Sequence, residues 1–113
     1  MIDLKTIAMH IQKDFDDIQK EIDKSIHQKM TKQTKQFLLL NAICNAIIKE
    51  IRKYDSKAFF QISSFNDGIV VIKFHIEGED LHIPIDLSEL ENTNLKHLLG
   101  EILLKLQRSI RSL

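Results

Sequence analysis

The sequence has little cysteine, proline and glycine. Among its 113 residues are one cysteine, one proline, three glycines and no tryptophan. A single cysteine excludes a disulfide-bonded scaffold within the chain. That residue, Cys44, follows Ile43 in an apolar stretch. Because burial raises the pKa of a thiol, we expect Cys44 to be a small core residue and not a catalytic or redox thiol.

Signals for secretion, membrane insertion and disorder are missing as well. Residues 1–5 begin no signal peptide, and no apolar run approaches the roughly 20 residues that a membrane-spanning helix needs. Hydrophobic residues make up 43% of the chain and the formal net charge is zero, a combination that excludes intrinsic disorder. We therefore expect one domain over residues 1–113, in an intracellular, cytoplasmic protein that does not bind membranes.

The zero net charge is the sum of segregated charges. Sixteen Lys and Arg residues balance sixteen Asp and Glu residues. A basic joint at residues 24–36 and a basic C-terminal segment flank a region, residues 77–91, that has acids and no Lys or Arg. The acids of that region are Glu77, Glu79, Asp80, Asp86, Glu89 and Glu91. A charged partner would therefore meet one patch and not the whole surface.

Two helices are predicted in the first half of the chain. Apolar residues spaced by three and four predict a helix over 4–29, capped by Asp3, with a charged back. Residues 1–30 could therefore protrude or dimerise. Residues 30–36 predict a break, with one continuous bent helix as the alternative. Residues 35–54 are apolar nearly all round, which is typical of a central helix covered on several sides.

The second half begins with a period of two, which predicts three strands, over about 57–65, 70–77 and 81–87. A two-residue turn at 78–79 would place Ile76 opposite Leu81 and put the apolar residues on one face. Pro84 predicts an edge strand, because proline cannot donate to a ladder. Tyr54 and Phe59 are expected to close the core. A last helix is predicted over 95–112, and the fold class is α+β with the order α-α-β-β-β-α and an antiparallel meander.

A metal-dependent enzyme with its metal site on the second hairpin is one alternative. The predicted register places His75 opposite His82 on the outer face, with Glu77 and Asp80 beside them. Directly opposed Cβ atoms lie about 5 Å apart, close enough for a shared divalent transition metal. The other interpretation is an exposed polar hairpin whose charge depends on pH. No Ser-His-Asp or Cys-His arrangement and no glycine-rich phosphate loop is present, so we expect neither an enzyme nor a cofactor.

Nucleic-acid binding is a second alternative. Its candidate phosphate contacts are Lys29, Lys32, Lys35, Arg108 and Arg111. No aromatic residue interleaves the lysines, so a base-stacking platform is missing. The two arginines also have a structural explanation, because a cation at the C-terminal end of a helix interacts favourably with the helix dipole.

Residues 78–90 resemble part of the YbaB/EbfC nucleoid-associated family. That family passes from its last strand through an Ile-Asp-Pro-x-Leu-Leu turn into a helix. Ile85, Asp86 and Leu90 match this turn, whereas Leu87 stands where the family favours proline. The order of a long helix, a three-stranded meander and a C-terminal helix is also similar, although an apolar second helix is added. The resemblance implies a dimer that binds DNA without strong sequence preference.

The apolar content favours a role in protein–protein contact. The predicted helices carry more apolar surface than one three-stranded sheet can cover, which predicts a homodimer or another protein partner. We expect a non-enzymatic interaction module of the adaptor, chaperone, immunity or inhibitor type, with apolar helix faces for affinity and the acidic hairpin for orientation. The candidate partner-binding residues are Glu77, Glu79, Asp80, Glu89, Glu91, Leu103 and Leu104.

Overall fold

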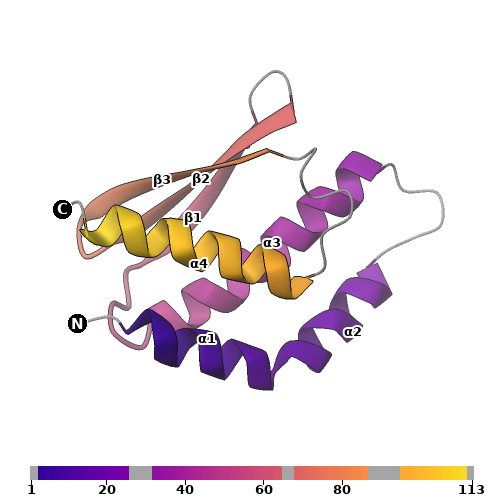
Figure 1. Cartoon of the computed structure of the whole chain (residues 1–113), viewed down its shortest axis with the longest axis horizontal. Helices are drawn as coiled ribbons and strands as arrows, with labels where there is room; N and C mark the ends of the chain where they lie inside the picture. The colour runs from indigo at the N-terminus through magenta and orange to yellow at the C-terminus, as the bar shows by residue number, and fades with distance from the viewer. Residues whose placement is uncertain (1–2, 26–31, 65–67, 87–94, 112–113) are drawn as a thin grey trace.

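The computed structural model describes residues 3–25, 32–64, 68–86 and 95–111. These residues form four helices and one three-stranded antiparallel sheet (Figure 1). In chain order the elements are α1 (Leu4–Lys13), α2 (Phe15–Ser25), α3 (Lys32–Ile51), β1 (Phe59–Ser64), β2 (Ile69–Ile76), β3 (Glu79–Asp86) and α4 (Leu95–Arg111). The predicted α+β class and the antiparallel meander are confirmed.

The N-terminal segment is two helices and not the single helix predicted over 4–29. Asp3 caps α1 as expected, because its carboxylate accepts the backbone N–H groups of Lys5 and Thr6 at 3.0 and 3.4 Å. The break falls at Asp14, whose N–H donates to the carbonyl of Ile11 at 3.1 Å, a tighter turn than an α-helix makes. Aspartate is a poor residue for a helix interior. The chain therefore bends there, and α1 and α2 lie at an angle in Figure 1.

The elements stack in three layers. The helices α3 and α4 cover one face of the sheet, with α3 against β1 and α4 against β3. On their other side lie α1, which contacts both α3 and α4, and α2, which contacts α3 (Figure 1). The sheet, α4 and the α1–α2 pair thus surround α3, and this explains why α3 is apolar nearly all round, as predicted. Its fully buried residues include Leu40, Ile43, Cys44, Ile47 and Ile51.

The register between β2 and β3 differs from the predicted one by two residues. Phe74 pairs with Leu81, and Ile72 pairs with Ile83. The turn residues are Glu77 and Gly78, with φ of 52° and 79°, and not Gly78 and Glu79. Positive φ at both central residues suits a two-residue hairpin turn. A shift of two leaves every side chain on its predicted face, so the apolar residues still point to the helices.

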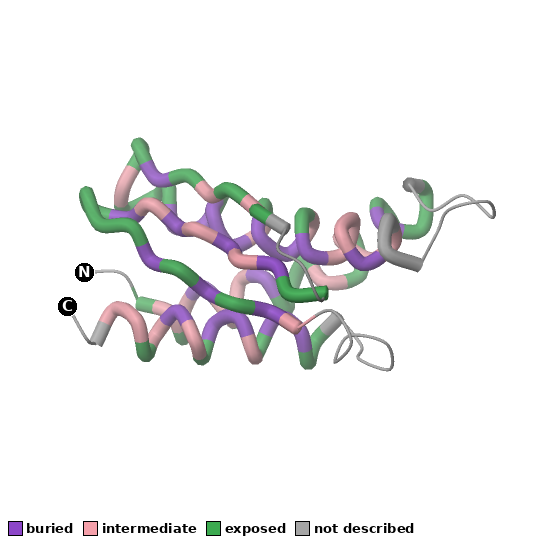
Figure 2. The backbone as a smooth tube through the Cα atoms, turned by 90° about the horizontal axis from the view of Figure 1, so that it is seen from above, coloured by how far each residue is buried: buried purple, intermediate pink, exposed green. Residues whose placement is uncertain are grey.

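Burial alternates strictly along the last two strands, as Figure 2 shows. The buried residues of this face are Val70, Ile72, Phe74, Ile76, Leu81, Ile83 and Ile85. The strand order is β1-β2-β3, so β3 with Pro84 lies at an edge, as expected. The expectation that Tyr54 and Phe59 close the core is wrong, because they are 48% and 36% exposed.

Candidate functional site

The structure does not bring together the residues of the predicted metal site. His75 pairs directly with Asp80, whereas His82 pairs with Lys73. The predicted opposition of His75 and His82 is therefore wrong, and the cross-strand partner of His82 carries a positive charge. Within the described residues, no three His, Cys, Asp or Glu side chains converge on a point where a metal could bind.

His75 instead belongs to a contact network on the outer face of the sheet. Its Nδ1 lies 2.7 Å from an oxygen of Asp80, and its ring stacks on Phe59 with 4.9 Å between the ring centroids. The Lys73 ammonium lies 5.8 Å from the centre of the Phe59 ring. The hydrogen bond with His75 lowers the pKa of Asp80 below its usual value. These contacts join the three strands and hold the register across the sheet.

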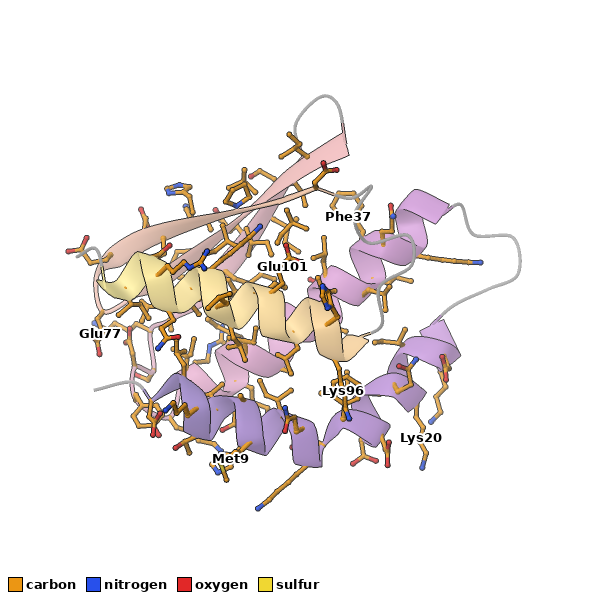
Figure 3. All side chains as sticks on the ribbon, viewed as in Figure 1. Met9, Lys20, Phe37, Glu77, Lys96 and Glu101 are labelled. Carbon is orange, nitrogen blue, oxygen red and sulfur yellow. The ribbon has the colours of Figure 1, made fainter. Side chains whose placement is uncertain are left out.

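Three acids of the predicted partner-binding set, Glu77, Glu79 and Asp80, are exposed at or beside the turn of the second hairpin. Glu77 and Glu79 are exposed, and Asp80 is held by His75. Figure 3 shows Glu77 at one end of the molecule. Glu89 and Glu91 lie outside the described residues.

The two leucines of the same set lie in different surroundings. Leu103 is in the core at 8% exposed, whereas Leu104 is 48% exposed. Leu104 alone of the pair is therefore open to a partner.

The basic residues proposed to contact nucleic acid are not gathered by the fold. Lys35 is partly buried in the first turns of α3, and Arg108 is exposed near the end of α4. The start of α3 and the end of α4 lie at opposite ends of the molecule (Figure 1). Lys29, and the side chains of Lys32 and Arg111, lie outside the description. The described part of this set therefore forms no shared patch.

The edge formed by β3 is protected against pairing with another strand. Pro84 has no N–H to offer, and its carbonyl accepts a hydrogen bond of 2.9 Å from the Lys105 ammonium on α4. Charged residues stand at both ends of the strand, with Glu79 and Asp80 at its start and Asp86 at its end. Charge, proline and a covering side chain are the usual means of keeping a sheet edge from aggregating.

The opposite edge, formed by β1, has none of these protections. Its sequence is Phe-Phe-Gln-Ile-Ser-Ser, without a charge or a proline. Among the described strands, β1 has β2 as its one neighbour. Its backbone therefore presents N–H and C=O groups along the outer side, which is the arrangement that accepts an added strand.

A cavity of about 490 Å³ follows this open edge, between β1 and α3. Its lining residues are Phe37, Leu38, Asn41, Phe60, Gln61 and Ile62. Figure 3 shows Phe37 projecting from the N-terminal half of α3 toward the sheet. Phe60 and Ile62 belong to the covered face, yet they stay partly exposed because they lie at its rim. The β1 edge and this cavity form the candidate functional site, and we call them the β1 edge site.

The sequence pattern predicts the open edge of this site but not the cavity beside it. The meander order predicts that β1 and β3 are the edges, and Pro84 marks β3 as the protected one. The cavity depends on how α3 packs against β1, which the pattern does not specify.

Cys44 takes no part in any of these surfaces. It is fully buried, as expected, and burial raises its pKa to about 12. The thiol is therefore not an available nucleophile near neutral pH.

Comparisons with known proteins identify no relative of this chain. Within the described ranges, every helix is too short or too polar to cross a membrane. The resemblance of residues 78–90 to the YbaB/EbfC family stays a prediction, and most of its turn lies outside the described residues. No family model, curated protein or solved structure matches the chain.

Proposed function

We propose that this chain is a non-enzymatic protein-interaction module that acts as a homodimer, with the β1 edge site as the surface that pairs with a second copy. The carrying observation is the contrast between the two edges of the sheet. One is protected by Pro84, Lys105 and terminal charges, whereas the other is uncharged and borders an apolar cavity. Unprotected edges are where proteins add a strand from a partner.

The composition of β1 suits pairing with itself. Two copies related by a two-fold axis would place their β1 strands antiparallel, with the same patch on both sides. Pairing centred on Gln61 sets Phe60 of each copy opposite Ile62 of the other, on the face that α3 covers. Because β1 has no charge, the paired strands themselves bring no like charges together. The apolar side chains at the rim would then be covered from both sides.

This proposal places the dimer surface differently from the sequence-based prediction. The apolar helix surface that led to the homodimer prediction is largely buried within one chain, because α1 and α2 form a third layer over α3 and α4. Among the described residues, the large apolar side chains left exposed are scattered over several elements: Met9, Tyr54, Phe59, Ile69 and Leu104. Glu77 and Glu79 keep their proposed role, which is to orient an approaching partner.

The oligomeric state tests the proposal. Sedimentation equilibrium at micromolar concentration should give the mass of two chains for the natural sequence, in low and in high salt. Gln61→Lys should give the mass of one chain, because the two lysines would meet across the two-fold axis and like charges directly opposite destabilise strand pairing.

His82→Lys is the matched control, since Gln61 and His82 are both exposed and both pair with Lys73, so each variant brings the same like charges together within one chain, but only Gln61 lies on the open edge. The control should leave the dimer intact. Far-UV circular dichroism would establish that both variants are folded. A single-chain mass for the natural sequence, or a folded Gln61→Lys variant that stays dimeric, would contradict the proposal.

A further inference from the structure

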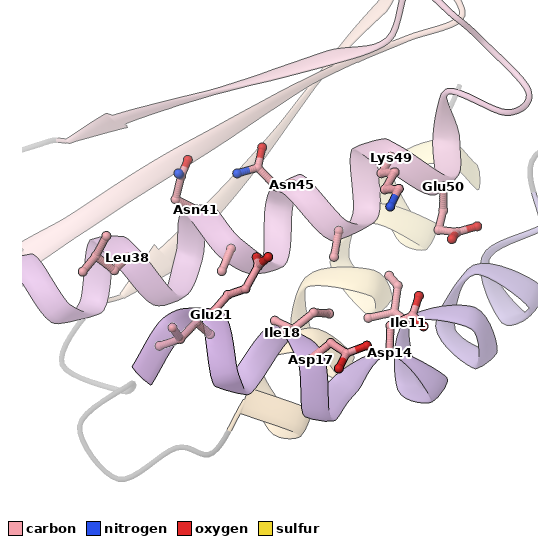
Figure 4. Close-up of a pocket in the computed structure, with 13 residues that line it drawn as sticks. Ile11, Asp14, Asp17, Ile18, Glu21, Leu38, Asn41, Asn45, Lys49 and Glu50 are labelled. Carbon is pink, nitrogen blue, oxygen red and sulfur yellow. The ribbon is translucent and has the colours of Figure 1, made fainter. Parts of the chain in front are cut away.

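A second hollow in the surface lies between α2 and α3, on the side of α3 that faces away from the sheet. It has a volume of about 490 Å³ and is open along its length (Figure 4). We call it the α2–α3 groove. Its apolar lining comes from both helices and from the end of α1, and consists of Ile11, Ile18, Ile22, Leu38, Ala42 and Ala46.

Small residues on α3 form part of the floor. Ala42 and Ala46 are four residues apart, so they lie on the same face of α3 and line the groove together. Both remain partly exposed, as does Ile18 across the groove. The floor is therefore apolar surface that the described residues leave partly exposed.

The wall formed by α2 is acidic. Asp17 and Glu21 line the groove four residues apart, which places them on one face of α2, and Asp14, the residue before the helix begins, lines it beside them. Figure 4 shows Glu21 reaching from α2 toward α3. From Asp17 to Glu21 the helical part of this wall extends about 6 Å at the helical rise of about 1.5 Å per residue.

The other wall contains neutral amides and one lysine. Asn41, Asn45 and Lys49 line the groove from α3, and in Figure 4 the two asparagine side chains project from the side of α3 that lies away from α2. The fourth acid of the lining, Glu50, belongs to α3 and contacts two basic side chains. Its Oε2 lies 2.8 Å from the Lys53 ammonium and 3.1 Å from Nδ1 of His10. The α2 wall therefore gives the groove a net negative charge.

We propose that the α2–α3 groove binds a basic amphipathic helix from a partner protein. Apolar residues on one side of such a helix would cover the Ile and Ala floor, which is the helix-in-groove mode of recognition. Lysines or arginines flanking that apolar stripe would face Asp14, Asp17 and Glu21. This charge complementarity selects a basic helix over an acidic one, which would meet the α2 wall with like charge.

This inference rests on the proposed role in protein interaction but does not require the homodimer. The two surfaces adjoin, because Leu38 and Asn41 line both the groove and the cavity beside β1. Their occupants differ, since β1 would take an extended strand and the groove a helix.

The test uses a fluorescent synthetic peptide with leucine on one helical face and lysine on the flanks of that face. Fluorescence anisotropy with the full chain should show saturable binding. Asp17→Lys should weaken it about tenfold, because an attraction is replaced by a repulsion. Asp16→Lys is the matched control: the same charge change on the adjacent exposed residue of α2, which does not line the groove. It should leave the affinity within about twofold of the natural chain.

Two further variants test separately whether the apolar floor and the oligomeric state contribute to the affinity for the peptide. Ala46→Phe should weaken binding without a change in charge, because the ring would fill the floor. Gln61→Lys should retain the groove and its affinity for the peptide, whatever it does to the oligomeric state. The inference is overturned if the peptide does not bind or if Asp16→Lys and Asp17→Lys lower the affinity for the peptide equally. It is also overturned if a peptide with glutamate in place of lysine binds with the same affinity.

Discussion

Asp55 accepts a hydrogen bond of 2.7 Å from the backbone N–H of Glu77, 22 residues further along the chain. This contact ties the connection after α3 to the turn of the β2–β3 hairpin. The same carboxylate accepts the N–H of Lys57 at 3.1 Å. The hydrogen bonds from Glu77 and Lys57 lower the pKa of Asp55 below its ordinary value of 3.8. The charged form of Asp55 is therefore the form that holds the hairpin.

Replacement of Asp55 by alanine should destabilise the fold in a pH-dependent way. Because the pKa of Asp55 is lower in the folded chain, its contribution is fully present above 3.8 and is lost as the pH falls through the folded value. Thermal unfolding followed by circular dichroism should give a lower Tm for Asp55→Ala near neutral pH. The difference should shrink as the pH falls well below 3.8. Ser56→Ala, at the exposed neighbour, should change little, and an equal loss of Tm for Asp55→Ala at every pH would contradict this account.

Glu77→Asn should stabilise the protein. Glu77 has a φ of 52°, a left-handed conformation that glycine and asparagine adopt more readily than glutamate. The gain should be about 1 kcal/mol in the free energy of unfolding, measured by denaturant titration. The backbone N–H that reaches Asp55 is retained. Glu79→Asn, two residues later and within β3, should give no such gain, because asparagine is disfavoured in strands.

The register of this hairpin shows what a period of two can and cannot determine. Alternation assigns Phe74, Ile83 and Ile85 to one face, and a shift by two residues leaves that assignment unchanged. The face was therefore predictable, whereas the pairing of His75 with Asp80 depended on the turn. The deciding signal is the pair Glu77-Gly78, an acidic residue before glycine, which resembles the Asp-Gly turns that need positive φ at both positions.

In the helical layers too, residue spacing predicts the individual helices but not how they pack in detail. The apolar stripes of α3 and α4 predict both helices, and the all-round apolar character of α3 predicts its central place. The bend at Asp14 is a single-residue event within an otherwise continuous stripe, so the spacing does not reveal it. The α2–α3 groove depends on that bend. The spacing of Asp14, Asp17 and Glu21 is visible in the sequence, but their position across from Ala42 is a tertiary result.

Gly100→Ala should stabilise α4. A Cβ atom at this position would meet no atom within 4 Å, so no close helix crossing requires the glycine. Alanine is favoured over glycine in a helix interior by about 1 kcal/mol, and a gain of that size is expected in the free energy of unfolding. Gly78→Ala is the informative contrast. It also has open space around it, but its φ of 79° makes alanine strained, so that substitution should destabilise the protein. A loss of stability in both variants would show that α4 needs the glycine for another reason.

Glu50→Gln should remove an acid-sensitive contribution to stability. Glu50 is buried on α3 and accepts hydrogen bonds from Lys53, two residues beyond the end of that helix, and from His10 on α1. Burial alone would raise its pKa, but the hydrogen bonds from Lys53 and His10 outweigh burial and lower it below the ordinary value of 4.5. The contribution of Glu50 is therefore present above 4.5 and is lost as the pH falls through the folded value.

Denaturant titrations across this pH range measure the effect. At neutral pH, Glu50→Gln should cost about 1–2 kcal/mol, because a buried charge-assisted hydrogen bond is weakened. Below the folded pKa of Glu50 the variant and the natural chain should converge. Glu101→Gln is the control, since Glu101 forms an i,i+4 pair with Lys105 at 3.3 Å on the surface of α4. Such a pair contributes only about 0.3–0.5 kcal/mol, so the loss should be small at every pH. If the two variants behave alike, the hydrogen bond between His10 and Glu50 does not anchor α1 to α3.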